Sequence, residues 1–181
     1  LISAYISQHF PQEVPPVMTD AIIPPDSTSN DVCVTIMDSS SHPNDREVLR
    51  RKIIAADSLI VVYDVTRPET FDSLANFWLP LIKDLSADQY KPVILLGTKT
   101  DLLLEEQDTQ PLNALLLAFS FVVNCWNCSA VNIQNLDTVF FLAELFVNYP
   151  LSFIFDVSEE EFTPAVRRAF LRLQGELGET A

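Results

Sequence analysis

The chain contains Val93-Ile94-Leu95-Leu96-Gly97-Thr98-Lys99-Thr100-Asp101-Leu102, an aliphatic run that stops at a glycine and is followed by a lysine and an aspartate. Four consecutive aliphatic residues without alternation are typical of a parallel strand that is buried on both faces. Open α/β sheets bind ligands beyond the carboxyl ends of their strands, so Lys99 and Asp101 are expected at a ligand-binding edge. The alternative is a solvated turn that merely follows a strand.

The composition is that of a globular domain with a sizeable core, since 48% of the 181 residues are hydrophobic and 20% are charged. The formal charge of −14 repels nucleic-acid backbones and anionic membrane surfaces, so nucleic acid is not an expected partner. The longest apolar stretches, around 112–123 and 139–147, are too short to cross a bilayer, and we expect no membrane segment in this chain. Three cysteines form no even disulfide framework, which favours a reducing compartment.

Strand-like and helix-like patterns alternate along the chain, which predicts an α/β fold with a mostly parallel sheet flanked by helices. The alternation ends near Pro150. Besides the run that starts at residue 93, we expect strands at 21–24, 32–38, 58–64 and 121–126, and helices at 1–10, 44–56, 68–82, 111–120 and 133–148.

Three segments resemble the small GTPases of the Ras superfamily. Thr-Lys-Thr-Asp at 98–101 resembles the motif that reads guanine, Tyr-Asp-Val-Thr-Arg-Pro-Glu-Thr-Phe at 63–71 resembles the same superfamily, and Trp-Leu-Pro at 78–80 resembles its Rho-like branch. The resemblance implies that the Asp101 carboxylate accepts two hydrogen bonds from guanine and that the Lys99 stem covers the ring. Adenine would be rejected, because its edge presents an acceptor where guanine has a donor.

A second part of the expected base pocket lies at Ser129 and Ala130. These residues resemble the Ser-Ala-Lys of the family, in which the backbone N–H after the serine reaches guanine O6, although Val131 replaces the lysine. The resemblance therefore implies a guanine site made of Thr98, Lys99, Asp101, Ser129 and Ala130.

The phosphate-binding part of the resemblance is incomplete. The three glycines, Gly97, Gly175 and Gly178, do not form the G-x-x-x-x-G-K-[ST] loop that cradles phosphates. The helix expected at 1–10 resembles the one that directly follows this loop in the family. The start therefore looks truncated, and we expect the first strand and the phosphate loop to be missing. That strand would lie beside the strands at 32–38 and 58–64.

The catalytic part of the resemblance is incomplete as well. Asp38 matches the aspartate of the Asp-x-x-Gly motif, which makes it a candidate for holding Mg²⁺ through water; a carboxylate that caps the next turn is an equal alternative. Residues 39–41 are serines in place of the glycine and the water-orienting glutamine, which implies slow GTP hydrolysis. Whether the chain is an enzyme stays open. For Cys125-x-x-Cys128 we favour strand-end packing over metal binding, because a second ligand pair is missing.

The segment after residue 150 narrows the resemblance to the mitochondrial Rho (Miro/Gem) GTPases. We divide the chain into a Ras-like domain at 1–150 and an acidic linker with a helix at 151–181, which resembles the entry to an EF-hand region but has no calcium loop. The family implies GTP/GDP and Mg²⁺ as ligands and protein effectors or motor adaptors as partners. It also implies a place on the cytoplasmic face of the mitochondrial outer membrane, with roles in mitochondrial transport and morphology.

Two alternatives to a GTP-binding domain remain. The first is a pseudo-GTPase scaffold or protein-interaction domain that binds no nucleotide. The second is a flavodoxin-like or other doubly wound binding domain, which gives no reason for the Thr-Lys-Thr-Asp motif.

Overall fold

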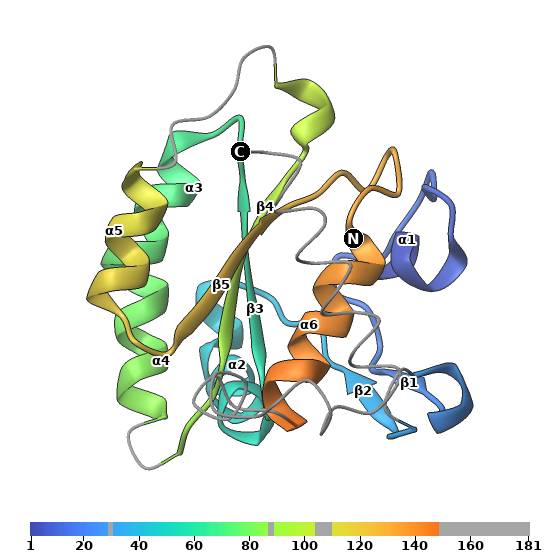
Figure 1. The fold of residues 1–181 in the computed structure, drawn as a ribbon, viewed down its shortest axis with the longest axis horizontal. Coiled ribbons are helices and arrows are strands. Elements are labelled where there is room, and N and C mark those ends of the chain that lie inside the picture. Colours follow the sequence, from blue (N-terminus) through green and yellow to red (C-terminus); the bar gives the residue numbers. More distant parts are fainter. Residues whose placement is uncertain (29–30, 87–88, 104–109, 149–181) are drawn as a thin grey trace, which may run out of the picture.

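The computed structural model of the chain describes residues 1–28, 31–86, 89–103 and 110–148. A three-stranded parallel sheet forms its centre, in the order β3 (Leu59–Asp64), β4 (Val93–Thr98) and β5 (Val122–Asn127). A separate antiparallel pair consists of β1 (Ala21–Ile23) and β2 (Val34–Ile36). The predicted α/β fold with a parallel sheet flanked by helices is confirmed (Figure 1). The linker and helix expected at 151–181 lie outside the described residues.

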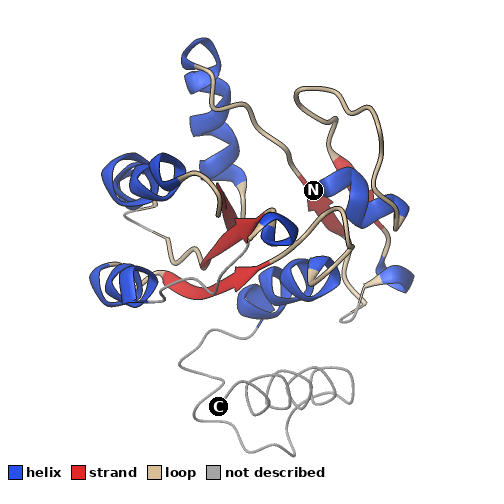
Figure 2. Cartoon of the chain, turned by 90° about the horizontal axis from the view of Figure 1, so that it is seen from above, coloured by secondary structure: helices blue, strands red, loops and turns tan. Residues whose placement is uncertain are grey.

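Helices cover both faces of the parallel sheet (Figure 2). One face packs against α2 (Arg46–Ala55), α3 (Pro68–Ser73), α4 (Leu79–Leu85) and α5 (Gln110–Ala118), and the other against α1 (Ile2–Ser7) and α6 (Leu136–Asn148). In β4, Val93 and Leu95 belong to the core under the first face, whereas Ile94 and Leu96 belong to the cores under the second. These four side chains are at most 1% exposed, so the strand is buried on both faces as its aliphatic run predicts. None of the helices in the described part of the chain is long and apolar enough to span a bilayer.

The helix expected at 68–82 exists but is interrupted by a π-helical turn at Leu74–Trp78. Leu79 N donates to Leu74 O, five residues back, instead of the usual four. Pro80 explains the wider turn, because a proline has no N–H and its ring clashes with the carbonyl four residues before it. Trp78 packs against the core, as expected.

Two helices are shorter than predicted. The first ends at Ser7 rather than near residue 10, because Gln8 adopts a left-handed conformation and its side-chain amide donates to Tyr5 O at 2.8 Å. The last begins at Leu136 rather than at residue 133, because Ile133 and Asn135 both have positive φ and hold a turn open before it.

The amino ends of the parallel strands are tied to α2 by a buried lysine. Lys91 is 4% exposed, and its Nζ donates to the carbonyl oxygens of Ile54 and Ala56 at the carboxyl end of α2. A cation at this end of a helix satisfies carbonyls that have no partner inside the helix and complements the helix dipole. The opposite edge, at the carboxyl ends of the strands, is where open α/β sheets bind ligands.

The two sheets do not pair with each other. Among the described strands, β3 pairs with β4 alone and β2 with β1 alone, so each has one edge without a partner strand. Val62 in β3 is 46% exposed, although its sequence neighbours Val61 and Tyr63 are buried. A further strand is expected from the sequence beside these two strands, β2 and β3.

Candidate functional site

A sharp turn at the end of β4 carries the predicted guanine motif. Lys99 has φ 67° and ψ 35°, the left-handed region that residues other than glycine seldom adopt. A short 3₁₀ turn, Thr100–Leu102, follows and is closed by a hydrogen bond from Leu102 N to Lys99 O at 3.0 Å. Unusual backbone conformations of this kind gather at functional sites, where the surrounding structure holds them in place.

The two predicted halves of the base pocket are joined by a short hydrogen bond. Ser129 Oγ donates to Asp101 Oδ1 at 2.6 Å, and Asn132 N donates to Ser129 Oγ at 3.1 Å. Ser129 is completely buried, whereas Asp101 is exposed. The turns after β4 and β5 are also linked by Thr100 N, which donates to the Cys128 carbonyl at 3.3 Å. Asp101 and Ser129 are 28 positions apart in the sequence, and their hydrogen bond fixes one oxygen of the exposed Asp101 carboxylate.

Lys99 is paired with a carboxylate that sequence reasoning did not assign to the site. Its Nζ lies 2.6 Å from Asp64 Oδ2, while Thr66 donates to Asp64 Oδ1 through its hydroxyl at 2.7 Å and its backbone N–H at 3.0 Å. The hydrogen bond from Lys99, with those from Thr66, lowers the pKa of Asp64 to about 2. Asp64 is therefore ionised at neutral pH. Asp64 is the last residue of β3 and lies in register with Thr98 at the end of β4. Its place at the end of a predicted strand is the sequence signal that could have identified it as a site residue.

Thr98 and Ala130 lie next to this cluster. Thr98 Oγ1 donates to the Tyr63 carbonyl at 2.9 Å, so this hydroxyl links the ends of β3 and β4. Ala130 follows Ser129 in a turn and is half-buried. The turn is closed by a two-way backbone pairing between Ser129 and Gln134, which fixes the position of the residues between them.

Gly97 lets these strand ends approach closely. A Cβ atom at this position would lie 2.3 Å from Asn127 Oδ1, 2.7 Å from Val65 Cγ1 and 2.8 Å from the Tyr63 hydroxyl. Each distance is shorter than van der Waals contact, so even alanine does not fit without movement. The glycine that ends the aliphatic run is therefore required by packing from both neighbouring strands.

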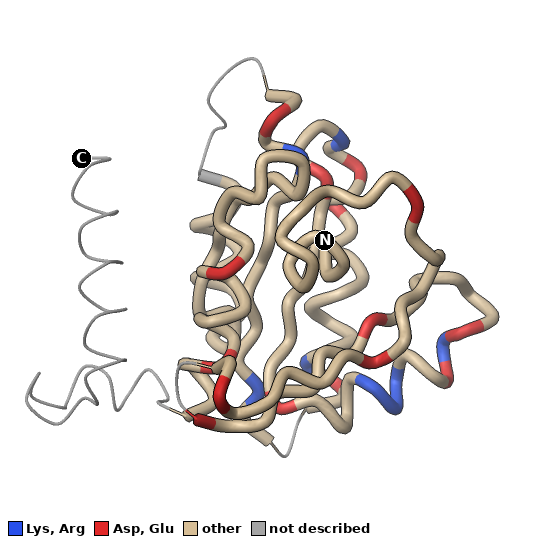
Figure 3. The backbone as a smooth tube through the Cα atoms, turned by 90° about the vertical axis from the view of Figure 1, so that its right-hand side faces the viewer, with Lys and Arg blue, Asp and Glu red and all other residues tan. Residues whose placement is uncertain are grey.

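Asp38 follows β2, which belongs to the separate antiparallel pair of strands. Its Oδ2 accepts from Met18 N at 2.8 Å and its Oδ1 from Ser39 N at 2.9 Å. Lys52, on α2, donates to the Asp38 carbonyl at 2.6 Å and pairs with Asp20 at 3.0 Å. Figure 3 shows Lys and Arg positions (blue) grouped along the helix at its lower right. The Asp38 carboxylate thus binds two backbone amides. No cluster of three or more His, Cys, Asp or Glu side chains suited to a metal occurs in the part of the chain that the structure describes.

The thiols of Cys125 and Cys128 are in their protonated form at neutral pH. Burial raises the pKa of each to about 11. A thiolate is the form that binds metal or attacks a disulfide, so this environment suits packing better than either chemistry.

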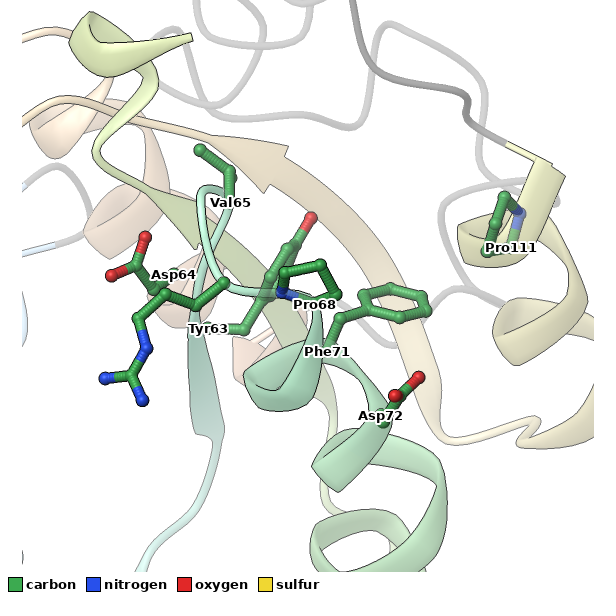
Figure 4. A pocket seen from close by; sticks show the side chains of 8 residues that line it. Tyr63, Asp64, Val65, Pro68, Phe71, Asp72 and Pro111 are labelled. Atoms are coloured by element: carbon green, nitrogen blue, oxygen red, sulfur yellow. The ribbon is translucent and has the colours of Figure 1, made fainter.

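A small pocket lies beside the site, at the carboxyl end of β3. Its volume is about 220 Å³, and it is lined by Tyr63, Asp64, Val65, Arg67, Pro68, Phe71, Asp72 and Pro111. Figure 4 shows the Asp64 carboxylate pointing away from Phe71 and Asp72. None of the five predicted guanine-site residues lines this pocket, which is therefore separate from the Asp101 cluster.

Comparison with known proteins identifies the family. Residues 1–147 match the model of the Ras family. Over 176 residues, which cover 96% of this chain, the sequence is 31% identical to Mitochondrial Rho GTPase 1 of Arabidopsis thaliana. The match covers 27% of that relative, so the chain spans about a quarter of its length. The resemblance to the mitochondrial Rho GTPases is confirmed, and the chain belongs to the Ras family.

Proposed function

We propose that this chain reads the guanine base in a GTP- and GDP-binding protein. The observation that carries the proposal is the hydrogen bond from buried Ser129 to Asp101, which joins the two segments expected to form the base pocket. A carboxylate has about four acceptor positions, so Asp101 keeps acceptors for a ligand after it has bound Ser129. Guanine presents a ring N–H and an amino group side by side, and both donate to such a carboxylate.

The other residues of the site have supporting roles in this proposal. The Lys99 stem covers one face of the base, and the Ala130 backbone N–H donates to guanine O6. Thr98 keeps the end of β4 in register with β3 through its bond to the Tyr63 carbonyl. Ser129 orients Asp101, because its hydroxyl donates to Asp101 Oδ1 and accepts from Asn132 N.

Asp38 is our candidate for holding Mg²⁺ through a water molecule. Each oxygen of the Asp38 carboxylate accepts from one backbone amide, and the described residues offer no group of three or more His, Cys, Asp or Glu side chains for a metal. Mg²⁺ commonly takes one or two carboxylates and completes its shell with water and substrate phosphates, and each Asp38 oxygen retains a second lone pair.

We propose that GTP hydrolysis is slow. The loop after β2 has serines at residues 39–41, and a serine hydroxyl is shorter than the glutamine that positions the attacking water in related GTPases. A nucleotide-free scaffold is the second candidate function. The observation that favours it is that backbone amides already use both oxygens of Asp38, as in a purely structural carboxylate.

The cellular role in this proposal follows from the relative, whose name places it among mitochondrial Rho GTPases. We propose that the protein containing this chain acts on the cytoplasmic face of the mitochondrial outer membrane, in mitochondrial transport and morphology. Protein effectors or motor adaptors would be its partners. The similarity over 96% of the chain supports this assignment.

Calorimetric titration of the full-length protein with GDP and ADP tests the proposed function. We expect GDP to bind and ADP to bind far more weakly. Asp101→Asn should weaken GDP binding by roughly ten- to a hundredfold, because a hydrogen bond to a charged group contributes about 1.5–3 kcal/mol. Asp72→Asn is the matched control, since Asp72 is an exposed acid outside the cluster. GDP affinity that is the same with and without Asp101 would show that the base is not read here.

A further inference from the structure

We propose that Asp64 is a positioning residue that holds the Lys99 side chain across the face of a bound guanine base. The inference rests on the proposed function and adds to it a residue on the neighbouring strand. It starts from the 2.6 Å contact between Lys99 Nζ and Asp64 Oδ2. The Asp64 side chain is 11% exposed and that of Lys99 is 55% exposed, so the carboxylate is the anchored partner and the lysine reaches it from solvent.

Contacts that do not involve Lys99 hold both the side chain and the backbone of Asp64 in place. Its second oxygen accepts from the hydroxyl and the backbone N–H of Thr66. Its backbone is held too, because Asp64 N donates to Thr70 Oγ1 at 3.0 Å and the Asp64 carbonyl accepts from Arg67 N at 3.0 Å. A carboxylate held by both its side chain and its backbone offers one defined position to an ammonium group.

The backbone of Lys99 is also fixed, at the other end of the same side chain. Its left-handed conformation lies between β4 and the 3₁₀ turn that contains Asp101. With the backbone set by the turn and the ammonium set by Asp64, the four-carbon stem spans the carboxyl edge from β4 to β3. A free lysine stem has many rotamers, and ordering it on ligand binding weakens affinity. Asp64 removes part of that cost in advance.

The ion pair also determines which part of Lys99 meets the ligand. The ammonium is engaged by Asp64, so the apolar stem faces the ring and contributes contact area without selecting a particular base edge. Asp64 and Asp101 would therefore act differently. Asp101 sets which base binds, whereas Asp64 sets how tightly any base of suitable shape is covered.

A double-mutant cycle in the full-length protein tests this division. GDP affinity is measured for the unsubstituted protein, Asp64→Asn, Lys99→Met and the double variant. We expect Asp64→Asn to weaken GDP binding by about three- to tenfold, between the effect of an exposed ion pair and that of a charged hydrogen bond. In the Lys99→Met background the same substitution should have little further effect, because its target is gone.

A second nucleotide separates positioning from base reading. Inosine diphosphate lacks the amino group of guanine, so its affinity relative to GDP reports the contact to Asp101. Asp64→Asn should lower both affinities by the same factor and leave their ratio unchanged. Asp72→Asn, which changes an exposed acid outside this pair, should change neither affinity.

Thermal unfolding of each variant checks that the fold is retained. Lys99→Met changes an exposed side chain, so it reports on the ion pair even if Asp64→Asn proves unstable.

The outcomes separate the two proposals. If the unsubstituted protein binds no GDP, the proposed function fails and the role of Asp64 fails with it. If it binds GDP but Asp64→Asn has no effect, or has the same effect with and without Lys99, only the positioning role of Asp64 is overturned. A changed ratio of inosine diphosphate to GDP would also overturn that role, because it would place Asp64 in base reading.

Discussion

Gly97→Ala tests whether the end of β4 is packed as closely as the structure indicates. The added methyl group would lie 2.3 to 2.8 Å from three side-chain atoms, which must each withdraw by roughly 1 Å to restore ordinary contact. Inserting a carbon into a well-packed core costs about 1–3 kcal/mol. Replacing glycine with alanine at a compatible position stabilises by about 0.4–1 kcal/mol through the unfolded chain. We expect a net loss of about 1–2 kcal/mol.

Amide hydrogen exchange in the full-length protein measures this loss locally. A decrease of about 1–2 kcal/mol should lower protection in β3, β4 and β5 by roughly five- to thirtyfold, whereas the separate pair β1 and β2 should change little. Asn127 makes the closest contact, and its Oδ1 is buried without a hydrogen-bond partner among the described residues. Asn127→Ala should therefore recover part of the loss when combined with Gly97→Ala. Unchanged or increased protection in Gly97→Ala would refute the packing argument.

Three further predictions concern individual side chains. Lys91→Met should remove the two hydrogen bonds that close α2 and weaken protection of that helix by about 1.5–3 kcal/mol in hydrogen exchange; an unchanged helix would contradict the capping role. The lowered pKa of Asp64, about 2 against an ordinary 3.8, stabilises the fold above about pH 4, and this contribution should be lost as the pH falls toward 2. In an NMR titration, Lys99→Met should raise the pKa of Asp64, and an unaltered midpoint would show that the ion pair is absent in solution. Iodoacetamide at neutral pH should modify exposed Cys33 well before buried Cys128, whose pKa is raised to about 11; equal rates would contradict this burial.

Sequence patterns predicted the parts of the fold that depend on local chemistry. The aliphatic run at 93–96 identified a strand buried on both faces, because alternation is lost only where both faces are covered. The family resemblance predicted that Asp101 and the Ser129-Ala130 segment belong to one pocket, and the structure adds a direct hydrogen bond between Ser129 and Asp101. Guanine binding by these residues stays a prediction. The glycine after the run was seen in the sequence as the end of a strand, but its packing role needs the neighbouring strands.

Other features depend on register and tertiary contacts that no local pattern encodes. Asp64 meets Lys99 because the ends of β3 and β4 align, and that alignment is set by pairing along the whole strands. Lysine is a residue type that is seldom fully buried, yet Lys91 is buried against carbonyl groups of a helix more than thirty residues earlier. The π-helical turn before Pro80 arises where a helix continues through a proline rather than stopping at it.

The central claim is that Asp101 reads the guanine base, and the most direct test is whether Asp101→Asn changes which base the protein prefers. Xanthine carries a carbonyl group where guanine carries its amino group, and Asp101→Asn replaces one carboxylate acceptor with a donor that matches it. Affinities of the full-length protein for GDP and xanthosine diphosphate should therefore favour GDP before the substitution and xanthosine diphosphate after it. The same ratio of the two affinities in both proteins would contradict the assignment of Asp101 as the residue that reads the base.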